Sequence, residues 1–396
     1  MSLNRLSRRS LLAGGVGALA GGQLLRPSTF RESFDADPSV STDEWLLPGR
    51  SPARRNHVPV TGGTELSVAW DRSFDGGSGY RVVVADGRAI VPVTDDAVYA
   101  VEVADGSTAW RARPRPESGY GVALGGEHIC CSTGDGFYVL GPSGNSKWWL
   151  PGYNYRTVES AGFLSTFLPV GSTLFTVGRR GLEARDMASG LRHWVGARPD
   201  GSRLTTNPLA FADGTLYCAG GRYGKQPFVA VDPEDGSQQW ATAAFEYENR
   251  QLAVDGDTLL ATGETEAGGR IQAFAVDDGA LRWQRATATG LLGPTVADGL
   301  VVCASEGGRL HAFDRTSGEQ RWTVGRQAAA DELVRTDNHL YVHSPRGAEV
   351  RDPSTGERRA LHELEGTDPN GFAYAGGHLF ALRDDRLFAL EVVDGA

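Results

Sequence analysis

Short runs of alternating apolar and polar residues, each closed by a turn signal, recur along the chain from Glu65 to its end. The segment from Leu310 to Trp322 shows the pattern, with a strand, a tight turn at Ser317-Gly318 and a second strand that ends on the tryptophan. Alternation with a period of two is typical of half-buried β-strands, whereas an amphipathic helix repeats every 3.6 residues. The pattern therefore predicts an all-β fold.

This two-strand unit is repeated, and its spacing indicates the architecture. Each repeat carries a second turn before its middle strands, for example Asp86-Gly87 and Asp298-Gly299. Asp-Gly pairs occur in both kinds of turn, for example at Asp105-Gly106 before Trp110, and they suit hairpins because both turn positions can adopt positive φ at little cost. Two turns and one longer connection per repeat predict four antiparallel strands, which make a propeller blade. The tryptophans that mark the repeat lie 38 to 46 residues apart, at Trp70, Trp110, Trp148, Trp194, Trp240, Trp283 and Trp322.

The two ends of the repeat region hold complementary fragments of one blade. The seventh repeat has Ala360–His362 where its tryptophan is expected, and Arg386–Gly395 then supplies a third strand and its turn before the sequence stops. At the other end, Thr64–Trp70 is a tryptophan-bearing strand with no strands before it. We therefore predict an eight-bladed β-propeller of four-stranded antiparallel blades over residues 64–396. The last blade is closed by the N-terminal strand, which leaves no open sheet edge.

The first 63 residues carry a different pattern. Residues 1–25 resemble a twin-arginine export signal, in which Ser7-Arg8-Arg9-Ser10-Leu11-Leu12 precedes a run rich in Gly, Ala and Leu. The alternative is an uncleaved N-terminal anchor, although about 15 apolar residues interrupted by glycines are few for a membrane span. Residues 26–63 contain five prolines among polar residues and predict an extended linker, lying partly along the domain surface. We expect export by the twin-arginine route to the cell surface, with membrane contact only through that first segment.

Charge and cysteine content narrow the class of partner. The formal net charge is −10, and 37 of the 39 basic residues are arginine. Such an acidic, lysine-poor composition is similar to that of halophiles with GC-rich genomes, although GC content alone is sufficient to explain the arginine bias. It argues against nucleic acid as a partner, because phosphate binding needs a basic face. The four cysteines form neither a disulfide framework nor a C-x-x-C metal motif.

The repeated motif A-x-D-x-x-[TS]-G-x-x-x-W resembles the PQQ-type β-propeller repeat. Phe313–Trp322 is the best match, and Val231–Trp240 and Ala184–Trp194 are variants of it. The resemblance implies that the seven tryptophans are structural and dock each blade against its neighbour. It also implies two functional branches. The quinoprotein dehydrogenases hold pyrroloquinoline quinone (PQQ) and a calcium ion on the propeller axis, whereas the BamB-like branch is non-enzymatic and binds proteins.

The vicinal pair Cys130-Cys131 is the candidate that favours a dehydrogenase, because quinoprotein dehydrogenases carry a strained disulfide of this kind. Counting four residues past the turn glycine places Cys130, Cys218 and Cys303 at one repeat position, which is an apolar core site in the other blades. Adjacent residues of a strand also point to opposite faces of the sheet, which disfavours a bond between them. We therefore interpret the cysteines as buried core residues.

Other candidate chemistry is sparse. His339 and His343 are four residues apart on one predicted strand and could share a metal, but no third ligand is evident. The sequence has no Asp-x-Asp-x-Asp calcium loop and no C-x-x-C-H haem motif. We predict no catalytic residue, no metal site and no cofactor, with PQQ and calcium as the alternative.

Two longer connections are candidates for contact with a partner: one carries Tyr153, Tyr155 and Arg156, and the other carries Arg222 and Tyr223. Aromatic and arginine residues in propeller loops suit protein or carbohydrate contacts, although local packing explains them equally well. The resulting prediction is an exported, monomeric, non-enzymatic scaffold that binds a protein partner in the cell envelope. The alternative is a PQQ- and calcium-dependent alcohol or sugar dehydrogenase.

Overall fold

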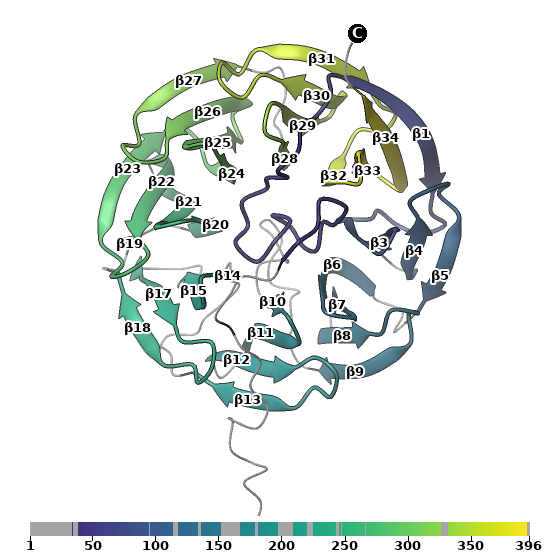
Figure 1. Ribbon diagram of the computed structural model, residues 1–396, viewed down its shortest axis with the longest axis horizontal. Coiled ribbons are helices and arrows are strands. Elements are labelled where there is room, and N and C mark those ends of the chain that lie inside the picture. Colours follow the sequence, from purple (N-terminus) through teal and green to yellow (C-terminus); the bar gives the residue numbers. More distant parts are fainter. Residues whose placement is uncertain are drawn as a thin grey trace, which may run out of the picture.

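The computed structural model describes residues 34, 39–94, 96–113, 118–133, 136–151, 167–178, 181–196, 209–219, 225–242, 245–246, 248–265, 267–325 and 332–393. Over these residues the chain forms eight four-stranded antiparallel sheets, which Figure 1 shows as blades around a central axis. A short ribbon of β16 (Lys225–Gln226) and β19 (Phe245–Glu246) is added beside the fourth blade. The prediction of an eight-bladed propeller is confirmed.

Within each of the first seven blades the strands follow the chain from the axis to the rim. The first four blades are β2 (Val83–Ala85), β3 (Arg88–Pro92), β4 (Val98–Glu102), β5 (Thr108–Ala112); β6 (Ser118–Gly125), β7 (His128–Thr133), β8 (Gly136–Leu140), β9 (Ser146–Pro151); β10 (Phe167–Val170), β11 (Thr173–Gly178), β12 (Gly181–Asp186), β13 (Arg192–Val195); and β14 (Leu209–Ala212), β15 (Thr215–Ala219), β17 (Phe228–Val231), β18 (Gln238–Ala241). The next three are β20 (Glu248–Asp255), β21 (Thr258–Thr265), β22 (Gly268–Ala275), β23 (Leu281–Thr287); β24 (Leu291–Ala297), β25 (Leu300–Ser305), β26 (Arg309–Asp314), β27 (Gln320–Gly325); and β28 (Glu332–Arg335), β29 (Leu340–Ser344), β30 (Gly347–Arg351), β31 (Arg358–Glu363).

The eighth blade is assembled from both ends of the ring. Its inner strands are β32 (Pro369–Ala375), β33 (His378–Arg383) and β34 (Arg386–Val393), and its outermost strand is β1 (Glu65–Ser73). β1 pairs antiparallel with β34 along its whole length, from Glu65 opposite Val393 to Ser73 opposite Arg386. The predicted closing strand is therefore confirmed, and it joins the two ends of the ring through backbone hydrogen bonds.

The hairpin between the two innermost strands of a blade, the inner turn, takes the predicted form in three blades. Both central residues have positive φ at Asp86-Gly87 (50° and 70°), and the same holds at Asp213-Gly214 and Asp298-Gly299. Two consecutive positive φ values match the right-handed twist of the flanking strands, which explains the Asp-Gly sequence.

The hairpin between the two outermost strands, the outer turn, is different. In the first blade Gly106 has a φ of 73°, but Asp105 does not have positive φ. The Gly106 N–H donates to the Glu102 carbonyl oxygen at 2.9 Å, and the strand pairing shifts by one residue between Ala100 and Val101. The expectation that both Asp and Gly of these turns adopt positive φ is wrong, because the turn is longer and a single glycine closes it.

The seven tryptophans make one recurring contact between blades. Each indole Nε1–H donates to a backbone carbonyl oxygen in the outer turn of the next blade, at 2.7 to 3.0 Å. Each ring also lies against the glycine of that turn, so a side chain there would overlap the indole. Tryptophan and glycine are therefore two halves of one contact. The ring–glycine pairs are Trp70–Gly106, Trp110–Gly144, Trp148–Gly190, Trp194–Gly236, Trp240–Gly279, Trp283–Gly318 and Trp322–Gly356.

The missing eighth tryptophan has a structural reason. Ala360 pairs with Val350 across the strand ladder, as Trp322 pairs with Ala312 in the blade before. A tryptophan at Ala360 would point toward the outer turn of the eighth blade. That blade has no such turn, because its two outer strands, β34 and β1, come from opposite ends of the ring. The seventh repeat therefore lacks the dock that a tryptophan would fill.

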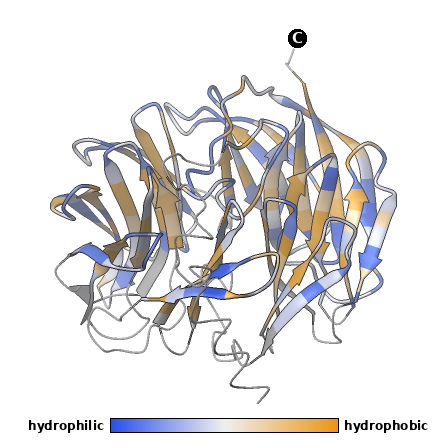
Figure 2. Ribbon diagram, turned by 60° about the horizontal axis from the view of Figure 1, so that its bottom comes forward, coloured by the Kyte–Doolittle hydropathy of each residue, from blue (hydrophilic) through white to orange (hydrophobic). Residues whose placement is uncertain are grey.

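The apolar core lies between neighbouring blades. Strands in the middle of a blade are buried on both faces, as in β29, whereas outermost strands such as β27 alternate between exposed and partly buried residues. Figure 2 shows this gradient, with hydrophobic residues concentrated on the middle strands and hydrophilic residues on the rim and turns. The surface open to other molecules therefore lies at the rim, at the two ends of the ring and at its turns.

Candidate functional site

The loop residues singled out from the sequence, namely Tyr153, Tyr155, Arg156, Arg222 and Tyr223, lie outside the described residues. The strands that flank them are described. The first loop leaves the end of β9 and returns at the start of β10, and the second leaves the end of β15. Those strand ends lie at the end of the blades opposite the inner turns, because strands alternate in direction within each blade. The partner-binding role of these five residues stays a prediction.

The described structure instead draws attention to residues 39–63, here called the lead-in segment. It crosses the centre of the ring beside the inner turns, and Figure 1 shows it as the dark purple trace inside the blades. Eight backbone N–H groups from seven blades donate to its carbonyl oxygens at 2.7 to 3.2 Å. Innermost strands are sheet edges whose N–H groups would otherwise face the axis, so the segment satisfies them. The acceptors are the carbonyls of Thr42, Trp45, Leu46, Pro52, Ala53, Arg55, Asn56 and Val60.

The contact repeats in register from blade to blade. In five blades the donor is the residue just before the last ladder pair of the inner hairpin, and these donors are Val84, Leu124, Phe211, Val254 and Val296. The third blade carries Pro169 at this position. Proline has no N–H to donate. Between Leu46 and Pro52 the lead-in segment makes a tight turn of its own instead, in which the Arg50 N–H donates to the Leu47 carbonyl at 2.7 Å.

Two buried arginines hold the lead-in segment in this shape. The Arg54 guanidinium donates to the Leu209 carbonyl and, at 2.9 Å, to the Pro48 carbonyl. Arg50 donates to the carbonyls of Val40 and Ser41, both at 2.9 Å. Burial lowers the pKa of each arginine to about 10, which still leaves both protonated at neutral pH. Hydrogen bonds from charged donors to carbonyl oxygens are stronger than those from neutral donors, so the two arginines fix the path of the segment.

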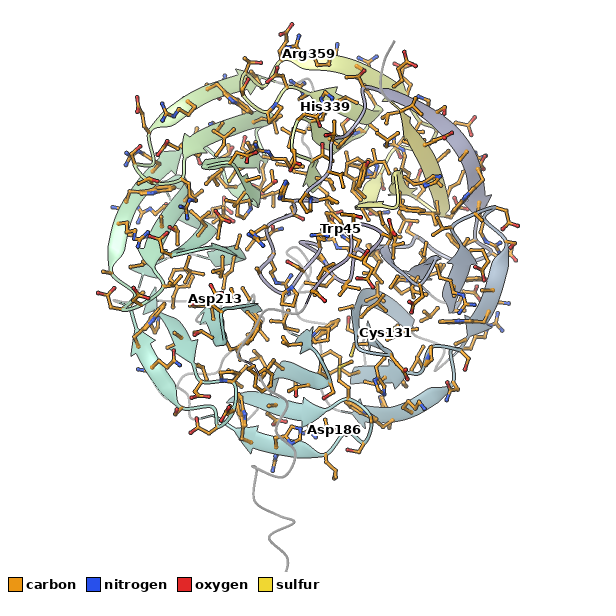
Figure 3. The ribbon with its side chains drawn as sticks, in the orientation of Figure 1. Trp45, Cys131, Asp186, Asp213, His339 and Arg359 are labelled. Atoms are coloured by element: carbon orange, nitrogen blue, oxygen red, sulfur yellow. The ribbon has the colours of Figure 1, made fainter. Side chains whose placement is uncertain are left out.

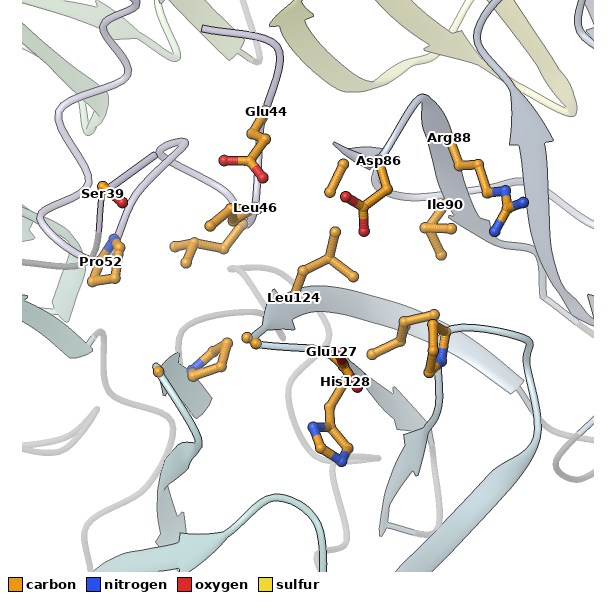
Figure 4. A pocket seen from close by; sticks show the side chains of 18 residues that line it. Ser39, Glu44, Leu46, Pro52, Asp86, Arg88, Ile90, Leu124, Glu127 and His128 are labelled. Atoms are coloured by element: carbon orange, nitrogen blue, oxygen red, sulfur yellow. The ribbon is translucent and has the colours of Figure 1, made fainter. Parts of the chain in front are cut away.

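A pocket of about 440 Å³ lies where the lead-in segment turns away from the third blade. Its walls come from the lead-in segment and from the inner turns of the first three blades, and Pro169 is among them. Figure 4 shows Leu46 and Leu124 in its middle, Glu44 and Asp86 on one side, and Glu127 and His128 on the other. Pockets of this size commonly hold small ligands or side chains of a partner. This pocket is the candidate site that the described residues supply.

Two basic groups at the pocket, Arg88 and His128, add no net positive charge to it. Arg88 Nε lies 3.2 Å from a carboxylate oxygen of Glu102, with which it forms an ion pair. Burial, and then the positive charge of Lys147, lower the pKa of His128 below its ordinary value. His128 is therefore neutral at neutral pH, and the pocket keeps an acidic character.

The cysteine pair is not bonded. Cys130 and Cys131 are both free and buried, and they face opposite sides of the second blade: Cys130 packs toward the third blade and Cys131 toward the first. Burial raises the pKa of Cys131 to about 12 and also raises that of Cys130, so both thiols stay protonated and unreactive. Figure 3 shows Cys131 inside the ring of blades.

The repeat position assigned to Cys130 from the sequence is wrong by one residue. The inner turn of the second blade is Gly126-Glu127, because Gly125 pairs with His128. In the first blade the corresponding glycine is the second turn residue, since Ala85 pairs with Arg88. Counting four residues from the turn glycine therefore gives a position that is one residue too early in the second blade. The residue equivalent to Cys218 and Cys303 is Cys131, not Cys130. The interpretation of all four as buried core residues holds.

His339 and His343 do not form a metal site. Within the described ranges, no three His, Cys, Asp or Glu side chains gather closely enough to hold an ion. His343 is fully buried, stacks on Phe372 with ring centroids 4.7 Å apart, and has no hydrogen-bond partner for either ring nitrogen among the described residues. His339 flanks the inner turn and is partly exposed.

We expect His343 to make stability depend on pH. Burial, and then the charges of Arg383 and Arg81, hold the pKa of His343 well below its ordinary value of 6.5. Glu332, opposite it on the ladder, is engaged by Arg81 and by the Phe372 N–H. Below pH 6.5 the unfolded chain binds a proton that the folded chain excludes, so stability falls as the pH falls. The measurement is the free energy of unfolding in urea between pH 7.5 and 5.

The matched pair of variants is His343→Phe, which keeps the stack on Phe372, and His362→Phe on the outermost strand of the same blade. His343→Phe should reduce the pH dependence, because the fully buried imidazole is removed. His311, whose pKa burial also lowers, keeps a smaller part of it. His362→Phe should leave the slope as in the wild type. An unchanged slope in His343→Phe would show that another group carries the effect.

The fold and its axial segment define the class: a closed eight-bladed propeller whose centre is crossed by its own lead-in segment. A family model described as "Outer membrane protein assembly factor BamB" matches residues 13–217, 95–251 and 224–371, which together span most of the chain. The chain belongs to this family of PQQ-type β-propellers. A BamB protein of Yersinia pestis is 27% identical over 248 residues, covering 56% of this chain and 62% of that protein. The match thus covers less than two thirds of that relative.

Two solved structures show the same architecture at low sequence identity. BamB from Moraxella catarrhalis superposes with a TM-score of 0.64 at 16% identity, over 83% of this chain and 100% of that one. The quinohemoprotein alcohol dehydrogenase ADHIIG from Pseudomonas putida HK5 superposes with a TM-score of 0.71 at 14% identity, over 92% of this chain and 84% of that one. At such identities the similarity concerns the fold, which both functional branches share.

Sequence reasoning predicted that the segment around Trp45 is pinned against the domain, but it missed that this segment crosses the axis of the ring. Trp45 is almost completely buried and exchanges two backbone hydrogen bonds with Val84, both of 2.8 Å, so it forms an extra strand-like contact inside the first blade. Figure 3 shows Trp45 near the centre of the ring. The signal was present in two places, as a tryptophan in the linker and as Pro169 where the other inner strands have an N–H. Neither signal has meaning until the blades are aligned in space.

Proposed function

We propose that this chain is an exported, non-enzymatic scaffold that binds a protein partner in the cell envelope. Membership of the BamB family is the observation that carries this proposal, since its model matches the lead-in segment and most of the propeller, as far as residue 371. Export by the twin-arginine route rests on Arg8-Arg9 and the apolar run that follows them. Among the described residues, no helix has the length and hydrophobicity of a membrane-crossing segment.

The geometry supports a scaffold in two ways. Hydrogen bonds of β1 to β34 close the ring, and the lead-in segment crosses its axis, so the blades form a rigid platform. Rigid platforms bind through the turns and loops at their ends. The loops carrying Tyr153, Tyr155, Arg156, Arg222 and Tyr223 are the proposed partner contacts at one end, because Tyr and Arg contribute much of the binding energy of protein interfaces.

The test is reconstitution of a defined complex. Partners captured from envelope fractions of the source organism by cross-linking are purified and mixed with the purified chain, and the affinity is measured by calorimetry. We expect a stoichiometric complex that Tyr153→Ala/Tyr155→Ala/Arg156→Ala weakens by at least about ten-fold, as for interface hot spots. Leu191→Ala/Arg359→Ala, two exposed rim positions, is the control and should bind as the wild type does.

One result would overturn the proposal. Reduction of an artificial electron-acceptor dye by the purified chain, dependent on both added PQQ and calcium, would identify a dehydrogenase instead. Calorimetric titration with PQQ in calcium-containing buffer is the companion measurement, and we expect no binding heat.

A further inference from the structure

The pocket between the lead-in segment and the first three blades points to a specific contact. We propose that it binds an arginine side chain presented by an extended segment of a partner protein. This inference deepens the scaffold function proposed above and rests on it. It places a partner contact at the inner-turn end of the propeller, opposite the strand ends that carry Tyr153 and Arg222.

The pocket exists because of a local change in sequence. Pro169 cannot donate to the lead-in segment, which therefore leaves the third blade uncovered between Leu46 and Pro52. Glycines at 125, 126 and 171 also line the space and add no side chain to it. A Cβ at Gly125 would meet Pro169 and Met187. Backbone and the ring of Pro169, which is held in the strand ladder, bound this side of the space, which makes it a preformed pocket.

The floor of the pocket is apolar. Leu46, Ile90, Leu124 and Ile129 line it, and Ile90 and Ile129 are buried in the core between the first two blades. A small ion would leave this surface in contact with water, whereas a long side chain would cover it. Arginine and lysine place their methylene stems along apolar surfaces and keep their charged ends at a polar rim. The floor therefore favours a long, amphipathic side chain.

The charged groups at the rim of the pocket favour a positively charged end on the bound side chain. Asp86 and Glu127 have exposed carboxylates that form no ion pair within the described part of the chain, and the Glu44 carboxylate accepts one hydrogen bond, from the Ser41 N–H at 2.8 Å. Figure 4 places these three carboxylates on two sides of the leucines. Arg88 is compensated by Glu102, and Asp186 lies close enough to His128 to offset part of the charge of Lys147. The rim is therefore acidic on balance.

Arginine fits better than lysine here. The carboxylates stand on opposite sides of the pocket, and a guanidinium has five N–H donors in a planar fork that can reach both sides. It is also more weakly hydrated than an ammonium group, so less free energy is lost when it leaves water. Arginine is accordingly the basic residue most enriched at protein interfaces.

The experiment uses three short peptides as probes of the full chain. Acetyl-Leu-Arg-Leu-amide, the same peptide with Glu in place of Arg, and the same with Gln are titrated by calorimetry. Photo-leucine versions locate the site by cross-linking and mass spectrometry. We expect binding of the Arg peptide, weakened by added salt as for a contact between exposed charges, and cross-links to residues of the pocket. No binding of the Glu peptide is expected.

The variants test the rim. Asp86→Asn/Glu127→Gln keeps size and hydrogen-bonding capacity, and asparagine tolerates the positive φ of Asp86 (50°). It should weaken binding of the Arg peptide by about ten-fold, since each hydrogen bond to a charged group contributes substantially. The matched control is Asp213→Asn/Asp277→Asn, which removes the same charge from an inner turn of equal φ (47°) and from an exposed outer turn away from the pocket. Equal affinity for the two double variants would overturn the proposal.

Three further outcomes are decisive. If removal of residues 1–33 strengthens binding of the Arg peptide by more than about ten-fold, the chain's own arginines in that segment, at 5, 8, 9, 26 and 31, compete for the pocket, and a partner is not its occupant. If a reconstituted partner binds Asp86→Asn/Glu127→Gln and wild type equally, the pocket contact is refuted while the scaffold function stands. If no partner exists but the Arg peptide binds through these carboxylates, the scaffold function fails and the arginine preference of the pocket stands.

Discussion

Removal of residues 1–63 is expected to leave a propeller that does not fold stably, whereas removal of residues 1–33 leaves stability unchanged. Eight carbonyls of the lead-in segment accept N–H groups of the inner strands. At about 1 kcal/mol per hydrogen bond, their sum is comparable with the whole stability of a typical domain. The side chains of the lead-in segment stabilise the fold further, because Trp45, Leu47 and Val58 belong to the core clusters. The measurement is urea unfolding followed by near-UV circular dichroism.

Adding the removed segment back as a peptide distinguishes the loss of its contacts from general damage to the propeller. A synthetic peptide of residues 34–63, added to the chain that begins at residue 64, should restore the unfolding midpoint in a concentration-dependent way. A peptide of the same composition in scrambled order should not, because the acceptor spacing follows the blades in register. Equal unfolding midpoints for the chains that lack residues 1–33 and 1–63 would show that the ring is stable without the lead-in segment.

The blade count could be predicted from sequence because it depends on local signals. Strand alternation recurs in every repeat, and turn glycines and a tryptophan recur in most of them, so an error at one position is corrected by the next. The closing of the eighth blade could be predicted as well, since Thr64–Trp70 and Arg386–Gly395 are complementary fragments. These features need no knowledge of which residues meet across the ring.

The features that escaped prediction are those set by three-dimensional register. Cys130 was placed at the wrong repeat position because Gly126 occupies the first position of its turn rather than the second. The pocket requires the simultaneous knowledge that Pro169 faces the axis and that the lead-in segment runs past it. Neither fact is local. A linker without periodicity gives no sign that its carbonyls will meet the inner strands of seven blades.

The contact of tryptophan with glycine is the second determinant of stability, and Trp283 tests it. Its indole is 6% exposed, donates to the Arg315 carbonyl at 2.8 Å and covers Gly318. Trp283→Ala should lower the free energy of unfolding by about 3–5 kcal/mol, as for other buried aromatic truncations. Leu281→Ala on the same strand, at a 44% exposed position, is the control and should cost less than about 1 kcal/mol.

Adding a tryptophan at the seventh blade tests whether the indole stabilises the ring only where an outer turn of the next blade lies against it. Ala360→Trp restores the repeat pattern, but no outer turn stands opposite it, so no gain in stability is expected. Gly318→Ala should destabilise the wild type, because its Cβ would meet the Trp283 ring and its φ of 67° disfavours any side chain. In the Trp283→Ala variant the overlap between the new Cβ and the indole disappears. The double variant should therefore lose less free energy of unfolding than the sum of the losses in the two single variants. Strict additivity would mean that tryptophan and glycine stabilise the ring independently, and the recurring contact would then be only a consequence of the repeat.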